Sequence, residues 1–216
     1  MTTNNYISSK SELQFFIAAD RIMNGLPARI SIRDRVFLLF GLSSLIEGGK
    51  TKEYLRLMRY SNYYSNQKGI VNRIISKIVD FKYYKLGLEL GFSISPKSFG
   101  YVLVIPHYGT IVINGDCIFG NYCVLHTSTC IAGGEKTFGD GLYLSAGAKI
   151  TGKGEYGDAI SIAANSVVKC SAPSHCLLAG MPAEIKKTDY PFWYERDGER
   201  FQHRVLKVEE LKKKIH

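Results

Sequence analysis

Residues 113–150 read INGDCIFGNYCVLHTSTCIAGGEKTFGDGLYLSAGAKI and carry the pattern that decides the fold of this 216-residue chain. A large, mainly apolar residue returns at every sixth position, and one inserted residue before position 138 is the single interruption. The series continues to residue 168 and comprises Ile113, Phe119, Leu125, Ile131, Phe138, Leu144, Ile150, Tyr156, Ile162 and Val168. The next residue is Gly, Ala, Ser or Thr in seven of the ten cases. Strands of an ordinary β-sandwich would alternate with period two and have irregular loops instead.

A six-residue period has a simple physical reading. Each hexapeptide forms a short strand and a turn, and three of them make one triangular coil. The large residue points into the prism, while its small neighbour relieves crowding at the corner. Stacked coils bury a continuous apolar column, and each coil is stabilised mainly by its neighbours.

Six stretches make the repeat resemble a known family. They are 91–96 (GFSISP), 106–113 (PHYGTIVI), 132–134 (AGG), 145–150 (SAGAKI), 164–168 (ANSVV) and 179–183 (AGMPA). The chain resembles hexapeptide-repeat acyltransferases, most closely the serine-acetyltransferase-like branch found in surface-polysaccharide biosynthesis. The resemblance implies a left-handed coil, against the usual right-handed rule for crossover connections. It also implies a homotrimer with active sites between adjacent prisms. The predicted fold is mainly β: a left-handed parallel β-helix with a helical N-terminal region and a short C-terminal helix.

Three segments follow from the change in composition along the chain. Residues 1–90 have helical periodicity, residues 91–187 form the acyltransferase domain, and residues 188–216 form a C-terminal extension. Ser9 or Ser11 is a candidate N-cap for the first helix. Between Gly69 and Tyr84, apolar residues recur at helical spacing, which predicts a face that packs in the core or against another subunit. We expect a helix from about Arg204 to cap the last coil.

His107 is the candidate catalytic base. Acetyl transfer from a thioester to a hydroxyl needs a group that removes the hydroxyl proton and a donor that stabilises the oxyanion. Histidine suits the first task because its ordinary pKa lies near neutrality. His107 lies in the stretch PHYGT, six residues before Ile113, and this stretch resembles the family's histidine motif. A lone histidine without such a motif is more often structural.

Further site residues come from spacing and from the resemblance. His126 lies nineteen residues after His107, about one coil further, and is predicted on the acceptor side or as a solvated corner residue. Tyr108, Asp116 and Glu135 are the other candidates for binding the acceptor. By resemblance, small residues line the groove for coenzyme A, although corners of coils need small residues in any case. They are Gly133, Gly134, Ala146, Gly147, Ala163 and Ala164. Lys186 and Lys187 are predicted to meet the phosphates of the coenzyme, unless they are merely solvated.

The distribution of charge and the spacing of the cysteines limit the kinds of ligand and partner that the chain is expected to bind. The net charge of +9 comes largely from residues 1–90, where 14 Lys and Arg face 7 Asp and Glu. This excess fits a solvated helical surface, or attraction to an anionic acceptor and peripheral association with a membrane-linked saccharide. No nucleic-acid motif accompanies it. The five cysteines and five histidines lack metal-binding spacing, so acetyl-CoA is the expected co-substrate and no metal is expected. Without a signal peptide or spanning segment, a cytoplasmic location is expected.

The identity of the molecule that accepts the acetyl group is the least determined part of the predicted function. Serine-using members of the family have an aspartate directly before the catalytic histidine, where this chain has Pro106, and an Arg-His-Pro stretch in a loop that here is only residues 135–137. An amino acid presents an ammonium and a carboxylate, which need a fixed acid and a fixed base. We therefore expect O-acetylation of a sugar hydroxyl in capsular or lipopolysaccharide biosynthesis. The alternatives are a serine O-acetyltransferase of cysteine biosynthesis, N-acetylation of an amino-sugar, and a non-catalytic assembly module.

Overall fold

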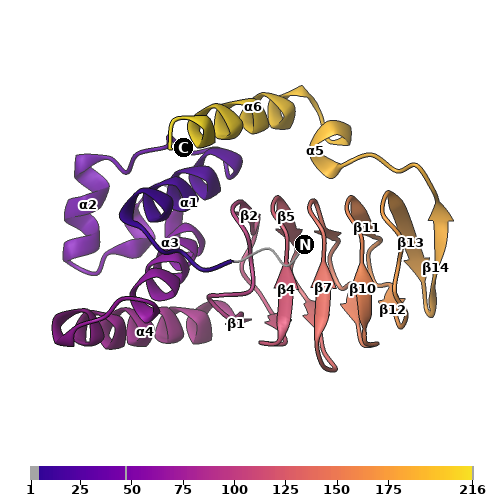
Figure 1. Ribbon diagram of the computed structural model, residues 1–216, viewed down its shortest axis with the longest axis horizontal. Coiled ribbons are helices and arrows are strands. Elements are labelled where there is room, and N and C mark those ends of the chain that lie inside the picture. Colours follow the sequence, from indigo (N-terminus) through magenta and orange to yellow (C-terminus); the bar gives the residue numbers. More distant parts are fainter. Residues whose placement is uncertain (1–4, 47, 216) are drawn as a thin grey trace.

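The hexapeptide repeats close into a triangular prism, and each of its three faces is a sheet built mainly of parallel strands (Figure 1). The computed structural model describes residues 5–46 and 48–215. The first face holds β1 (Phe92–Ser93), β3 (Ile111–Ile113), β6 (Thr129–Ile131), β9 (Lys149–Ile150) and β12 (Val167–Val168). The second face holds β4 (Cys117–Phe119), β7 (Lys136–Phe138) and β10 (Gly154–Tyr156). The third face holds β2 (Leu103–Val104), β5 (Cys123–Leu125), β8 (Tyr143–Leu144), β11 (Ile160–Ile162), β13 (Cys176–Gly180) and the antiparallel β14 (Ala183–Lys187).

The predicted left-handed β-helix is confirmed, and the six-residue series forms its core. All ten residues from Ile113 to Val168 are at most 5 % exposed. Four aromatic rings stack along the inside of the prism, from Phe99 through Phe119 and Phe138 to Tyr156. Their centroids are 4.1, 4.5 and 4.6 Å apart, and successive planes differ by 13° or less. The register of one coil over the next is therefore held by side chains as well as by strand pairing.

The N-terminal region is a group of helices at one end of the prism (Figure 1). It comprises α1 (Lys10–Met23), α2 (Ile32–Leu39), the 3₁₀ turn η1 (Ser43–Leu45), α3 (Gly49–Ser65) and α4 (Ile70–Leu90). Ser9 caps α1: its Oγ accepts from the N–H of Glu12, and the Glu12 carboxylate accepts from the N–H of Ser9. The chain then passes from α4 through Gly91, whose φ of +78° favours glycine, into the first coil.

The apolar face predicted between Gly69 and Tyr84 is not part of the core of this protomer. Ile70, Ile74, Ile78 and Phe81 are between 53 and 77 % exposed. The buried side of α4 instead carries Tyr83, Leu86 and Leu90, which pack toward α3 and the first coil. Periodicity located an apolar stripe correctly, but the residues that pack lie on the other side of the helix and later in the sequence. Contact with another subunit stays a prediction for the exposed stripe.

The C-terminal extension also differs from expectation. It contains α5 (Trp193–Arg196) and α6 (Glu199–Lys213). Rather than capping the last coil, α6 lies along the third face and packs against α1 (Figure 1). Trp193 is buried and donates from Nε1 to the carbonyl of Tyr122 at 2.6 Å, while Val208 joins the same apolar cluster. Val104 and Val124 on the third face belong to this cluster, so the extension buries apolar side chains on the flank of the prism.

Side chains from the helices form hydrogen bonds with backbone groups at the open edge of the first coil. Arg59, fully buried, pairs with Asp20 through Nε at 2.8 Å and Nη2 at 3.1 Å. The same guanidinium donates to the carbonyls of Phe99 and Gly100, and Asp20 Oδ1 accepts from the N–H of Leu103. Strand edges normally leave such groups unpaired. Here two charged side chains take the place of the missing neighbouring coil.

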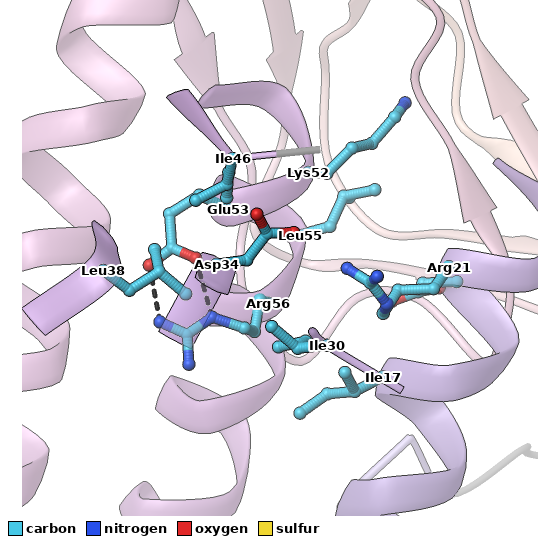
Figure 2. Close-up of a pocket in the computed structure, with 11 residues that line it drawn as sticks. Ile17, Arg21, Ile30, Asp34, Leu38, Ile46, Lys52, Glu53, Leu55 and Arg56 are labelled. Carbon is cyan, nitrogen blue, oxygen red and sulfur yellow. Dashed lines mark hydrogen bonds and ion pairs between the residues drawn. The ribbon is translucent and has the colours of Figure 1, made fainter. Parts of the chain in front are cut away.

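A small cavity of about 20 Å³ lies between α1, α2 and α3, with charged residues in its wall (Figure 2). Glu53 is buried, and its two carboxylate oxygens accept from Nε and Nη2 of Arg56 at 2.7 Å each. The cavity has room for little more than a water molecule. Within the part of the chain that the structure describes, no helix is long and apolar enough to cross a membrane.

Replacing Arg59 by methionine is expected to reduce the free energy of unfolding by about 3–5 kcal/mol, because a buried partner charge and two carbonyls lose their donor. Urea denaturation measures this loss. Arg73→Met, at an exposed position on α4, is the matched control and should change stability by less than about 0.5 kcal/mol. A loss below about 1 kcal/mol for Arg59→Met would contradict the role given to the pair.

Candidate active site

His107 lies in the turn between the third and first faces. It follows β2 and Ile105, which is fully buried, and it precedes β3; its own side chain is exposed. We call the column of turns after β2, β5, β8 and β11 the histidine corner. Tyr108, 75 % exposed, extends from the same turn. The buried strand before it and the buried Ile111 after it hold this turn at the surface of the prism.

The structure brings His126 to the same corner, one coil further along. Its Nε2 lies 2.9 Å from the hydroxyl of Tyr143. Burial lowers the pKa of His126, the nearby His107 lowers it further, and Asp197 raises it. Burial also raises the pKa of the Tyr143 hydroxyl. Both shifts favour the neutral forms of the two side chains, which share this hydrogen bond.

Lys52 ties the strand that leads to His107 to the helical region. Its Nζ donates to the carbonyl of Ile105 at 2.8 Å and to Oδ1 of Asn24 at 2.6 Å. Asn24 Nδ2 in turn donates to the carbonyl of Leu103 at 3.0 Å. Burial lowers the pKa of Lys52 to about 8, although Asp20 raises it. Figure 2 shows the side chain extending from α3 away from Glu53 and Arg56.

Four of the predicted cofactor-groove residues line the histidine corner. Ala146 and Gly147 follow β8, and Ala163 and Ala164 follow β11. Their turns stack closely. The N–H of Gly147 donates to the backbone carbonyl of Thr127, and the N–H of Asn165 donates to the backbone carbonyl of Ala146, each at 3.0 Å. Gly147 has φ +74°, and a Cβ there would lie 2.1 Å from Oδ1 of Asn165. This corner therefore presents backbone and small side chains.

The structure places the other predicted groups elsewhere. Gly133 and Gly134 follow β6 at the far side of the first face, in a column of turns that we call the glycine corner. Lys136 Nζ donates to their carbonyls at 2.6 and 3.2 Å. Glu135 and Asp116 are exposed at the same corner, after β6 and β3. Within one protomer a whole face thus separates these four residues from His107.

Lys186 and Lys187 lie on β14, at the far end of the third face. Both are exposed; Lys186 pairs with Glu184 at 2.8 Å, and Lys187 lies 5.8 Å from the ring centroid of Tyr190. From β2 to β14 there are five steps between adjacent strands, roughly 24 Å at about 4.8 Å each. Lys187 pairs with Leu177 at the start of β13, whereas the turns of the histidine corner follow the ends of the parallel strands.

Sequence reasoning missed one charged pair beside the histidine corner. Arg196 donates from Nε to Oδ1 of Asp197 at 2.7 Å and from Nη1 to Oγ of Ser161 at 3.1 Å. Its guanidinium carbon lies 5.1 Å from the ring centroid of Tyr143 and 5.0 Å from that of Tyr190. The sole signal in the sequence was the aromatic run just before this pair, which indicated packing but not where the pair would lie.

Among residues 5–46 and 48–215, no three His, Cys, Asp or Glu side chains gather as a metal-binding group. No protein-family model matches the chain. It is 30 % identical over 166 residues to a serine acetyltransferase of Staphylococcus xylosus, covering 70 % of this chain and 72 % of the relative. It is 31 % identical over 151 residues to a serine acetyltransferase of Staphylococcus aureus strain N315, covering 66 % of each.

Solved structures of the same kind share the fold. A serine acetyltransferase in complex with CoA has a TM-score of 0.57 and 23 % identity, over 78 % of this chain and 68 % of that one. The Neisseria gonorrhoeae serine acetyltransferase in complex with serine has a TM-score of 0.54 and 17 % identity, over 84 % of this chain and 85 % of that one.

The pKa of Lys52 gives a pH-dependent prediction. The folded chain releases this proton near pH 8 and the unfolded chain near 10.5, so between these values the folded chain binds fewer protons. Its contribution to the free energy of unfolding therefore rises with pH over this window. Cysteine and tyrosine side chains titrate there too, so the measured quantity is the stability difference between wild type and Lys52→Met. The free energy of unfolding of wild type minus that of Lys52→Met should increase by about 1–2 kcal/mol from pH 7 to 9.5. A difference that is constant or falls with pH would refute the lowered pKa of Lys52.

Proposed function

The chain belongs to the serine acetyltransferase family and is an acetyl-CoA-dependent acyltransferase, and from this membership we propose that it acetylates the hydroxyl of L-serine. The observation that carries the proposal is the 30 % identity to the Staphylococcus xylosus serine acetyltransferase over more than two thirds of both chains. The names of the relatives favour serine over the sugar acceptor that the sequence alone indicated. The exposed histidine in the family's motif, at a corner with small residues, supports the same chemistry.

In this proposal His107 is the general base. Its imidazole takes the proton of the acceptor hydroxyl while the hydroxyl oxygen forms a bond to the acetyl carbon. The carbon–sulfur bond then breaks, and the imidazolium returns the proton to the departing thiolate, so that atoms and charges balance. His126 and Tyr108 lie at the same corner and hold the acceptor. In the tautomer that carries its proton on Nδ1, a neutral His126 contributes an N–H donor while its Nε2 accepts from the Tyr143 hydroxyl.

Acetyl-CoA is proposed to lie along the histidine corner. Ala146, Gly147, Ala163 and Ala164 provide the smooth wall, and backbone groups in these turns pair with the amides of the pantetheine arm. Lys186 and Lys187, near the last coil, meet the phosphates.

We also propose that the enzyme is a homotrimer. The glycine corner of one protomer, with Asp116, Glu135, Gly133 and Gly134, then completes the site of its neighbour. This arrangement accounts for predicted site residues that a single protomer keeps apart. The exposed apolar side of α4 supports contact between subunits.

A saccharide hydroxyl of capsular or lipopolysaccharide biosynthesis is the second candidate acceptor. Pro106 in place of an acid, and the short connection of residues 132–135 between β6 and β7, favour it, because an uncharged sugar needs no fixed ion pair. Peripheral association with a membrane-linked saccharide through the basic helical flank belongs to this candidate.

The acceptor test measures thiol release from acetyl-CoA with L-serine and with a panel of sugars and nucleotide-sugars. Wild type is expected to turn over L-serine, and His107→Ala to lower the rate 10²- to 10⁴-fold. His203→Ala, at an exposed position on α6, is the control and should keep the rate. Turnover of a sugar but not of serine would establish the second candidate; His107→Ala with full activity would remove the proposed base.

The groove test replaces the exposed Ala164 by phenylalanine. The ring should block one or two hydrogen bonds to the pantetheine arm and raise the KM for acetyl-CoA about tenfold, with the KM for the acceptor unchanged. Glu155→Phe, exposed on β10 of the second face, serves as the matched variant and should leave both constants as in wild type. Equal effects of the two substitutions would argue against a groove along the histidine corner.

A further inference from the structure

The turn that carries His107 is held on both sides by the helical region. On the side before it, Lys52 of α3 donates from Nζ to the carbonyl of Ile105 at 2.8 Å. On the side after it, the N–H of Gly109 donates to the carbonyl of Leu90, the last residue of α4, at 3.0 Å. The turn is therefore held between two helices that follow one another in the chain.

We propose that Lys52 is a positioning residue for acetyl transfer, because its ammonium fixes the Ile105 carbonyl and thereby the place of the His107 imidazole. This inference rests on the proposed function, in which His107 is the general base, and it holds for any acceptor of the acetyl group. The helical region then does more than close the open edge of the first coil, since it also sets the geometry of the reaction.

The covalent path from this contact to the histidine is short and stiff. The Ile105 carbonyl belongs to the peptide group that joins Ile105 to Pro106, and a peptide group is planar. The ring of Pro106 also fixes its φ at about −65°. The soft backbone dihedrals that remain before the side chain of the base are ψ of Pro106 and φ of His107. A displacement of the held carbonyl is therefore passed on to the imidazole.

Lys52 is itself held in place. Its Nζ also donates to Oδ1 of Asn24 at 2.6 Å, and Nδ2 of Asn24 donates to the carbonyl of Leu103 at 3.0 Å. Burial lowers the pKa of Lys52 to about 8, so the side chain is still charged at neutral pH and its hydrogen bonds are charge-assisted. A Cβ at Gly48 would collide with Cγ of Lys52, so this glycine leaves room for the stem of the lysine.

Contact with the next coil completes the hold on the turn. Gly109 has φ +128°, and a Cβ there would collide with Oγ1 of Thr127, the residue after His126. The turn of His107 therefore lies against the turn of His126. A general base must lie within hydrogen-bond reach of the proton that it removes, and a misplacement of about 1 Å can cost about 10²-fold in rate. The contact of Lys52 should therefore act on kcat.

The test measures kcat of full-length variants with L-serine, or with the acceptor that wild type turns over, at a temperature below every unfolding transition. Lys52→Met keeps a stem of similar length but has no donor. It is expected to lower kcat at least about tenfold, with the KM values for acetyl-CoA and acceptor within about twofold of wild type. Lys52→Arg can donate to both oxygens and should recover kcat to within about threefold. Should Lys52→Met fail to fold, Lys52→Gln, which is one atom shorter than lysine, replaces it with the same expected loss.

Two control variants separate positioning from stability. Lys50→Met, also on α3, loses an ion pair with α4 and should keep the wild-type kcat. Arg59→Met lowers the stability of the same helical region, but Arg59 contacts the carbonyls of Phe99 and Gly100, which lie farther along the chain from the base. Its kcat should therefore stay within about threefold of wild type below its unfolding transition.

The outcomes distinguish the inference from the proposed function. If Lys52→Met keeps the wild-type kcat while His107→Ala is inactive, the proposed base stands and the inference is wrong. Equal losses of kcat in Lys52→Met and Arg59→Met would also contradict it, because the lysine would then only stabilise the helical region. If His107→Ala keeps full activity, the proposed base is wrong and the inference fails with it.

Discussion

The hydrogen bonds that close the open edge of the first coil are the constraint on which this structure depends. A β-helix cannot begin without leaving backbone N–H and C=O groups unpaired, and an exposed edge of that kind invites aggregation. Here Arg59 and Asp20 satisfy the edge around residues 99–103, and Lys52 and Asn24 satisfy the carbonyls of Ile105 and Leu103. The helical region is therefore structurally part of the β-helix, and the contact between Lys52 and Ile105 lies two residues from His107.

The position of the histidines follows from the stacking of the coils. Because the inward residues hold each coil in register, turns after β2, β5, β8 and β11 lie above one another at one corner. His107 and His126 then share a corner although nineteen residues separate them. The same stacking places small residues in a column beneath them and brings Tyr143 to His126. A repeating scaffold thus converts a spacing in the sequence into a linear site.

Part of this site was predictable, and particular residues show why the rest was not. His107 was found through its motif, and His126 through its distance of about one coil. Asp116 and Glu135 were assigned to the same site, but they follow strands of the first face and therefore lie at its other side. Arg196 and Asp197 escaped notice, since nothing in a charged tail shows which face of the prism it will cover. Similarly, the apolar stripe of α4 was seen, but its exposed orientation was not.

The β-helix was predictable from the sequence, because the six-residue period requires one inward side chain per strand and can be counted along the chain. The family motif around His107 is likewise visible in the sequence. How the helices seal the first coil, where α6 lies and which charged groups contact the third face depend on packing in the folded chain. Those features depend on contacts between residues as far apart as Tyr122 and Trp193, or Asp20 and Leu103. Such contacts have no period, so only the folded chain reveals them.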